Sequence, residues 1–395
     1  MATMNEHLPE EITTQILYRL PLKQVIRFSC TSKRWRSIVS DPQFAKSHFT
    51  FASERRTLSH RLLLSTPSHM ESLDLQTPSF VEDSCIRKPI CPFKQPGRPV
   101  FTLGSCNGMV FVSLDFHDGF YIWNPSTGLF LKLPNPGFAS EENKTISCLH
   151  HCGFGYVSAT DDYKVVVAAP SEVNPAMPIQ VFSSKSTSWK RFESPPHFSL
   201  MRWFDTIRGS LTNEALHWLD ELREPELDTS RYTITAFDLD REEFREMPLP
   251  ISGETLSDRS FLRGVGVVFG GCLCVSSFDG EYFQLWVMME YDVGESWTKL
   301  FKFKNAGIHL VLPVFYTERR VVMWGCRFWD GEVDDLLIRF DHNEEEKLDR
   351  VAVCSATYWL GRNGYGPYRF EPGHCHMIQY DESLLWLHDS RAEGR

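Results

Sequence analysis

The 395-residue sequence contains no apolar run of the roughly eighteen residues that a membrane-spanning helix requires. Its beginning also lacks the apolar stretch of a secretory signal peptide, and acidic residues occur at Glu6, Glu10 and Glu11. We therefore expect no membrane partner and an intracellular location, in the cytoplasm, the nucleus or both.

The sequence also lacks the paired spacings that mark disulfide frameworks and zinc sites. Its eleven cysteines are an odd number, and we expect free thiols. Three short clusters of Cys and His occur, at residues 148–152, 272–274 and 374–376. None has the C-x-x-C and H-x-x-x-H pairs of a zinc site, and each lies in a strand-like stretch where alternate residues face opposite sides. We expect no metal and no cofactor.

Basic stripes are absent as well, although the charge is unevenly distributed. Residues 1–50 hold seven Lys or Arg and four Asp or Glu, whereas the rest of the chain holds 34 basic and 47 acidic residues. An acidic body without a nucleic-acid-binding signature excludes nucleic acid as the expected partner. The basic first fifty residues suit an acidic protein partner.

Catalytic motifs are missing too. No glycine-rich loop introduces a helix as phosphate binding requires, Ser296 is not in a nucleophile elbow, and Cys106 has no evident base nearby in the sequence. We expect no catalytic residue.

The first fifty residues predict a compact helical module. Pro9 suits the first turn of a helix, and Glu10 and Glu11 favour the positive end of its dipole. Every fourth residue is then apolar, which places one set on a single helical face: Leu8, Ile12, Ile16 and Leu20.

Proline and capping residues divide the rest of this module. Pro21 ends the first helix, because a residue before proline is pushed out of the α region. A second short helix follows from Leu22, and Ser32 caps a third. Asp41 and Pro42 start a last turn through Phe44. Three short helices cannot bury so much apolar surface among themselves, so the module either binds another protein or packs as a cap on the rest of the chain.

These residues resemble an F-box, of the form found in the large plant family with an F-box-associated domain. The resemblance rests on residues 8–12, 16–21, 30–36 and 38–44. Family members commonly have valine at the position of Thr31 and leucine near Val25. The resemblance implies docking to the Skp adaptor of a Skp–cullin–F-box ubiquitin ligase. It assigns ten positions to the adaptor interface or its supporting core: Leu8, Pro9, Ile12, Ile16, Leu20, Pro21, Leu22, Val25, Trp35 and Ile38.

Beyond the module, the sequence predicts an all-β body built from a repeat. Short β runs alternate with turns, and an aromatic residue closes the last hairpin of successive units at Phe130, Trp189, Phe244 and Trp297. A period between 50 and 60 residues with three or four strands per unit is typical of a kelch-like propeller blade. We expect about six blades, with seven blades or an irregular β-sandwich as alternatives. The run Leu62–Leu64 would begin the first blade, and residues 377–380 and 384–388 would close the ring beside it.

The body also resembles the plant F-box-associated interaction domain, notably at residues 107–108, 123–125, 153–156, 161–166, 216–219 and 285–288. The expected organisation is an F-box at 1–49, a connector at 50–60, a propeller-like domain at 61–390 and a polar tail at 391–395. The tryptophans at repeat positions are interpreted as packing between blades.

The combined resemblance implies a non-catalytic adaptor, which binds the Skp protein and through it a cullin, and which selects an unidentified protein substrate. A propeller-type enzyme and a glycan-binding module with an F-box are the alternatives. For the substrate face we select one loop rich in glycine and aromatic residues, with Tyr365, Tyr368, Arg369 and Phe370.

Overall fold

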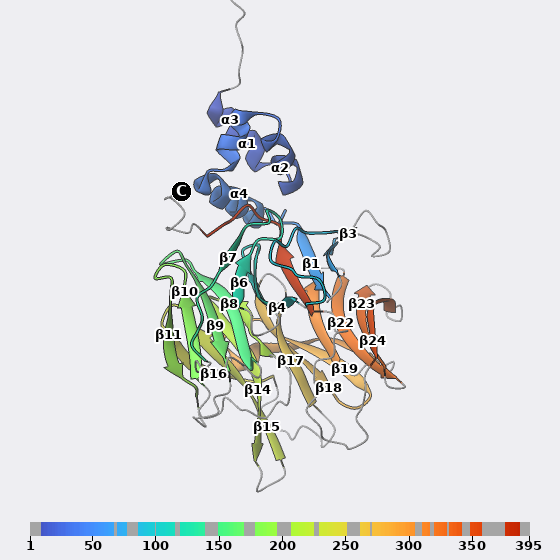
Figure 1. Cartoon of the computed structure of the whole chain (residues 1–395). Coiled ribbons are helices and arrows are strands. Elements are labelled where there is room, and N and C mark those ends of the chain that lie inside the picture. Colours follow the sequence, from blue (N-terminus) through green and yellow to red (C-terminus); the bar gives the residue numbers. More distant parts are fainter. Residues whose placement is uncertain are drawn as a thin grey trace, which may run out of the picture.

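The computed structural model describes sixteen stretches of the chain: residues 9–66, 69–76, 86–98, 100–114, 119–138, 149–169, 178–195, 207–224, 229–250, 261–268, 271–304, 310–316, 320–329, 332–341, 348–357 and 376–387. Helices occupy the beginning, and strands form nearly all the regular structure after residue 59. Figure 1 shows the helices together on one side of a ring of sheets.

The helical module contains four helices, so the expectation of three was wrong. They are α1 (Glu10–Tyr18), α2 (Leu22–Ser29), α3 (Lys33–Val39) and α4 (Pro42–Glu54). Pro9 and Pro21 are the N-cap residues of α1 and α2. Pro9 thus lies one residue before the first turn in which it was expected, and α1 ends at Tyr18, before Pro21.

Helix α4 is longer than expected: it has 13 residues, whereas the sequence predicted a single turn. The Asp41 carboxylate accepts a hydrogen bond from the Gln43 backbone N–H at 2.8 Å and caps the helix, and Pro42 occupies its first turn. Its buried residues recur at helical spacing: Phe44, Ala45, His48 and Ala52. Residues 50–54 of the expected connector are therefore helical, and only residues 55–59 separate α4 from the first strand.

The described strands form six sheets. The first contains β25 (His376–Asp381), β1 (His60–Ser65), β2 (Met70–Asp74) and β3 (Ile86–Arg87). The second contains β4 (Val100–Cys106), β5 (Met109–Leu114), β6 (Phe120–Trp123) and β7 (Phe130–Lys132). The third contains β8 (His151–Val157), β9 (Asp162–Ala168), β10 (Pro178–Ser183) and β11 (Ser188–Glu193), with β12 (Ile207–Arg208) beside β8.

The remaining three sheets each have four strands in sequence order. The fourth contains β13 (Ser210–Thr212), β14 (Ala215–Glu224), β15 (Thr229–Asp238) and β16 (Glu243–Met247). The fifth contains β17 (Phe261–Val268), β18 (Cys272–Phe278), β19 (Tyr282–Met288) and β20 (Trp297–Lys304), with a 3₁₀ turn at Gly294–Ser296. The sixth contains β21 (Leu310–Tyr316), β22 (Arg320–Trp329), β23 (Glu332–Asp341) and β24 (Leu348–Thr357).

The sheets are arranged in a closed ring, which is a β-propeller and not a sandwich. Strands at the inner edges of successive sheets contact one another in the order β25, β4, β8, β13, β17 and β21, and β21 contacts β25 again. In the first sheet β25 pairs antiparallel with β1, from His60 opposite Asp381 to Ser65 opposite His376. This pairing confirms the expectation that residues 377–380 close the ring beside the first strands. Residues 384–387 are not a strand, which corrects the other half of that expectation.

Neighbouring sheets pack against each other on both faces, which explains the continuous apolar runs in the sequence. All described residues of β5, β6 and β9 are buried. Close packing at the inner edge also requires a small residue: a Cβ atom on Gly104 would lie 2.8 Å from the Phe154 Cβ of the next sheet.

Tryptophans at repeat positions join adjacent sheets, as the sequence predicts. The indole N–H of Trp189 donates to the Pro134 carbonyl of the preceding unit at 2.8 Å, and that of Trp297 donates to Pro248 at 2.9 Å. Each bond joins the beginning of the outermost strand of one sheet, β11 or β20, to the segment that follows the outermost strand of the preceding sheet, β7 or β16. The repeated sequence therefore encodes a repeated contact between units.

A strand at the inner edge adds a further connection through the middle of the ring. β12 runs parallel to β8, and Gly209 between β12 and β13 donates its N–H to the Cys152 carbonyl at 2.7 Å. The Arg208 guanidinium then reaches β4 and β25, where it donates to the backbone carbonyls of Thr102 and Met377. One side chain thus ties together three inner strands that are distant in the sequence.

Candidate functional site

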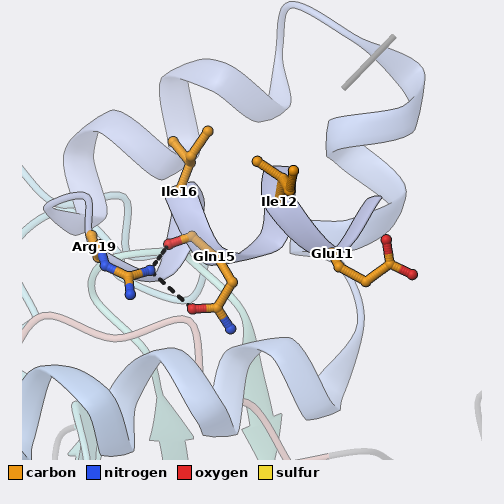
Figure 2. A pocket seen from close by; sticks show the side chains of 5 residues that line it. All are labelled: Glu11, Ile12, Gln15, Ile16 and Arg19. Atoms are coloured by element: carbon orange, nitrogen blue, oxygen red, sulfur yellow. Dashed lines mark hydrogen bonds between the residues drawn. The ribbon is translucent and has the colours of Figure 1, made fainter. Parts of the chain in front are cut away.

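Helix α1 presents two large apolar side chains to solvent. Ile12 is 48% exposed and Ile16 is 43% exposed, whereas Thr13 and Leu17, about 100° further round the same helix, are buried. The two isoleucines line a shallow hollow of about 370 Å³, together with Glu11, Gln15 and Arg19. Figure 2 shows the two isoleucines beside each other, with the polar side chains along one flank. An exposed apolar strip with a polar rim has the composition of a protein-docking surface.

A small core holds this face in place. Leu17, Val25 and Phe44 are buried at its centre, and half-buried side chains surround them: Tyr18, Leu20, Phe28, Trp35, Ile38 and Val39. The Tyr18 and Phe44 rings stack with centroids 4.9 Å apart, and the edge of the Trp35 ring meets Phe28 at 5.1 Å. The core therefore uses all four helices to fix the orientation of α1.

Polar contacts complete the support of α1. The Arg19 guanidinium donates to the side-chain oxygen of Gln15 at 2.9 Å and also to its backbone carbonyl, which closes one end of the hollow (Figure 2). The His48 imidazole of α4 lies 3.0 Å from the Leu20 carbonyl, and burial lowers the pKa of His48. A neutral imidazole is consequently favoured there, with its N–H directed at the carbonyl.

The residues predicted for adaptor docking divide into two groups. Pro9, Ile12, Ile16 and Pro21 are exposed and can contact a partner, whereas Leu22 and Val25 are buried and Leu20, Trp35 and Ile38 are half-buried in the supporting core. Leu8 lies outside the described residues. Leu17 and Phe44 were missed as core positions, although their spacing from other apolar residues is compatible with helical packing.

The residues predicted for the substrate face, Tyr365, Tyr368, Arg369 and Phe370, also lie outside the described part of the chain. The two strands on either side of them are described. Thr357 ends β24, and His376 begins β25. Because His376 pairs with Ser65, at the end of β1 remote from α4, β25 begins on the side of the ring away from the helices.

The two faces of the ring differ in the chain segments that reach them. Short turns between the first and second strands of a sheet, such as residues 107–108 and 158–161, lie on the side of the helices. Because neighbouring strands of a sheet are antiparallel, the first strand begins and the fourth strand ends on the side away from the helices. The chain leaves one sheet and enters the next on that side. The β14–β15 hairpin also projects to that side (Figure 1). Connections between sheets therefore start and end opposite the helical module, whereas the connection from β2 to β3 starts and ends on the side of the helices.

A buried polar chain near the inner edge was not recognised as a unit from the sequence. The rings of His150 and His151 lie 2.8 Å apart at their Nδ1 atoms, and His151 Nε2 lies 2.7 Å from an Asp220 oxygen. The Thr235 hydroxyl donates to the other oxygen of Asp220 at 2.5 Å. Burial opposes ionisation of Asp220, yet these hydrogen bonds leave its pKa below the usual value. The signal in the sequence was only the pair of adjacent histidines.

Within the described ranges, no group of three or more His, Cys, Asp or Glu side chains is placed to hold a metal ion. Cys148, His374 and Cys375 lie outside those ranges. Cys152 and Cys274 are buried free thiols, and burial raises the pKa of Cys152 to about 12. None of the described helices is long and apolar enough to span a membrane.

Comparison with known proteins identifies both parts of the chain. Residues 6–47 match the F-box domain, and residues 68–383 match the F-box associated beta propeller domain. The F-box protein CPR1 of Arabidopsis thaliana is 31% identical over 311 residues, which cover 74% of this chain and 72% of that protein. An F-box/kelch-repeat protein of the same plant is 26% identical over 324 residues, which cover 80% of this chain and 85% of its relative.

The chain therefore belongs to the family of F-box proteins that carry an F-box associated beta propeller domain. Among solved structures, one chain of a nidogen/laminin complex aligns with 82% of this chain and 99% of its own length. Its TM-score is 0.46 and its sequence identity 12%, a resemblance too distant to inform function.

Proposed function

We propose that this protein is the substrate-recognition subunit of a Skp–cullin–F-box ubiquitin ligase. Its F-box binds a Skp-family adaptor and thereby a cullin scaffold, while the propeller binds a target protein. Its contribution is positional and not catalytic, because a bound target acquires a high effective concentration beside the ubiquitin-charged enzyme. The proposed place of action is the cytoplasm, the nucleus or both.

The observation that supports this proposal is the exposed strip formed by Ile12 and Ile16 on a firmly supported α1. Two isoleucines nearly half exposed on one helix face would gain from burial against a partner, at about 25 cal/mol per Å² of apolar surface removed from water. The neighbouring Leu17 is fully buried, so the helix cannot rotate to hide them without losing its own core. Membership of the F-box family supplies the expected class of partner.

The arrangement of the propeller supports separate binding surfaces for the adaptor and the target. We propose that each of the six sheets is one blade, and that the target binds on the face opposite the helices. Loops between strands vary more freely than the strands themselves, and binding residues are concentrated on them. The connections between sheets begin and end on that face, whereas the F-box and its adaptor occupy the other. Both partners therefore bind without competing for surface.

The direct test of adaptor docking is a double substitution in α1. Ile12→Asp with Ile16→Asp is expected to weaken binding of a purified plant Skp adaptor at least 100-fold, because both carboxylates would have to be buried unpaired. Isothermal titration calorimetry measures the loss. The thermal unfolding midpoint of the free chain should barely change, since both side chains already contact solvent.

Ile90 provides a matched control. It is 75% exposed and lies in the propeller domain, so Ile90→Asp introduces the same chemical change away from the F-box. Adaptor affinity should then equal that of the natural chain. An α1 double variant that binds the adaptor normally would exclude this surface as the docking site.

The proposed substrate residues are tested separately. Replacing Tyr365, Tyr368 and Phe370 together by serine is expected to remove target proteins that co-purify with the adaptor-bound complex, because aromatic side chains dominate interface energies. Adaptor binding and thermal stability should stay unchanged. If the triple variant retains the same targets and still shortens their cellular half-lives, target recognition lies on other residues.

A further inference from the structure

The chain continues past the closing strand β25 as a segment that we call the strap, residues 382–387. Its beginning is fixed to the first sheet. The Glu382 N–H donates to the Ser59 carbonyl at 3.0 Å, and its carboxylate pairs with Arg87 and lies 3.9 Å from the Arg61 Nε. Arg61 is buried in β1, where the ring closes, so the Glu382 carboxylate helps to balance the positive charge of its guanidinium.

The middle of the strap is fixed to the second sheet. The Asn124 side-chain amide donates to the carbonyls of Ser383 at 3.0 Å and Leu385 at 2.8 Å. The Ser383 hydroxyl donates to the Asn107 carbonyl at 2.9 Å. The adjacent Gly108 has φ +80°, and a Cβ atom there would lie 2.6 Å from the Asp381 carbonyl oxygen and would collide with Ser383. The turn is thus shaped to accept the strap.

The end of the strap packs into the propeller core. Leu387 is buried in the large apolar cluster that includes Phe101 and Phe154, and Trp386 packs against the same cluster. The backbone is therefore held on both sides of Leu384 by contacts with the propeller alone.

Leu384 faces the other way and joins the F-box core. Its side chain packs against the cluster centred on Leu17, Val25 and Phe44. A residue more than 300 positions away in the sequence thereby becomes part of the small core that supports α1. The F-box and the propeller share this one leucine, whose backbone is fixed from both ends.

A second contact lies on a different part of the ring. The Lys46 ammonium of α4 pairs with the Asp161 carboxylate at 3.0 Å, and the Tyr156 hydroxyl donates to the same carboxylate at 2.5 Å. These hydrogen bonds lower the pKa of Asp161. Both charged side chains are largely exposed, so the pair orients the helix more than it stabilises it.

We propose that the strap locks the F-box in one orientation on the propeller, with Leu384 as the locking side chain. Without it, the F-box would lose this core contact with the propeller and keep the short connection 55–59 and the exposed Lys46–Asp161 ion pair. Domains joined by a small interface are expected to move relative to each other. With it, the contacts fall at three separated points, which fixes a rigid orientation.

The test uses the full chain with two fluorophores attached through non-natural amino acids at Ser37 of α3 and Asp240 of the β15–β16 turn, both exposed. Single-molecule energy transfer reports the distance between F-box and propeller. The natural sequence should give one narrow distribution, and Leu384→Ser should broaden it. Amide hydrogen exchange in α4 should become about tenfold faster in this variant, while exchange in β25 stays the same because the ring remains closed.

Leu385→Ser is the matched control. The backbone carbonyl of Leu385 accepts a hydrogen bond from Asn124, and its side chain is not among those packed on the F-box cluster. It should keep the narrow distribution. If Leu384→Ser does not fold, Leu384→Ala is measured by the same two readouts. A Leu384 variant that keeps both the narrow distribution and the slow exchange in α4 would overturn the proposal, as would equal broadening by Leu385→Ser.

Discussion

Ending the chain at Cys375, which removes β25 and the strap, is expected to abolish cooperative unfolding of the propeller. Every residue of β1 from His60 to Ser65 would lose its partner in β25, and an unpaired inner strand is a template for aggregation. The buried Arg61 would lose Glu382 as well, although Asp74, 3.7 Å away, and the hydrogen bonds to Ser72 would remain. Loss of the whole β1–β25 pairing opens the ring, and an ordinary domain has only about 5–15 kcal/mol of stability to lose.

Urea denaturation and size-exclusion chromatography measure this outcome directly. The shortened chain should elute as aggregates and show no sharp transition. Removing only Ala392–Arg395, the expected polar tail, should leave both measurements unchanged. A monomeric protein with a normal transition after loss of β25 would show that β1–β25 pairing is not required for ring closure.

Trp218→Ala is expected to lower the free energy of unfolding by about 3–5 kcal/mol, as other core tryptophan truncations do. Trp218 has no exposed surface, and it packs in the cluster between the third and fourth sheets with Leu216 and Phe237. Its indole N–H donates to the Cys152 carbonyl at 3.1 Å, so the variant also leaves that inner-strand carbonyl without this donor. The cavity and the lost hydrogen bond act in the same direction.

Trp189→Ala provides the comparison at a repeat position nearer the surface. Trp189 is only half-buried, so its loss should cost about 1–2 kcal/mol at the usual value per unit area. Urea titration of both variants gives the difference. Equal destabilisation would contradict the packing of Trp218 at the junction of the two sheets.

Much of the propeller was predictable because the chain repeats short-range rules. The Asn124 side chain accepts from the Ser126 backbone N–H at 2.8 Å, and Gly128 has φ +79°, as a turn with a left-handed glycine requires. Such turns depend on a few neighbouring residues. Ring closure was also predictable, since an apolar strand at the end of a repeat needs an edge to pair with.

The length of α4 was missed because the F-box resemblance ends near Phe44 and the sequence after it was interpreted as a connector. The spacing of Phe44, His48 and Ala52 is that of a helix face, but His48 is polar and only its contact with the Leu20 carbonyl explains its burial. That contact joins two helices, so a local pattern alone does not reveal it.

The α1 face was identified as one unit, and the structure divides it. Ile12 and Ile16 remain exposed, while Leu20 turns toward the core because α2 and α4 cover it. The strap was mistaken for a strand because residues 384–387 are a short apolar run. What distinguishes it is the Asn124 amide, 259 positions before Ser383, which occupies the carbonyls that a strand would pair. A local pattern in the sequence does not reveal a contact between residues so far apart.

Synthesis order gives the position of β25 a consequence in the cell. More than 300 residues separate α4 from β25, so at about 5–20 residues per second the F-box leaves the ribosome roughly 15–65 s before the ring can close. During that interval α1 has its own neighbouring helices but not Leu384, and β1 has no inner partner. The nascent chain therefore exposes α1 before its propeller is complete.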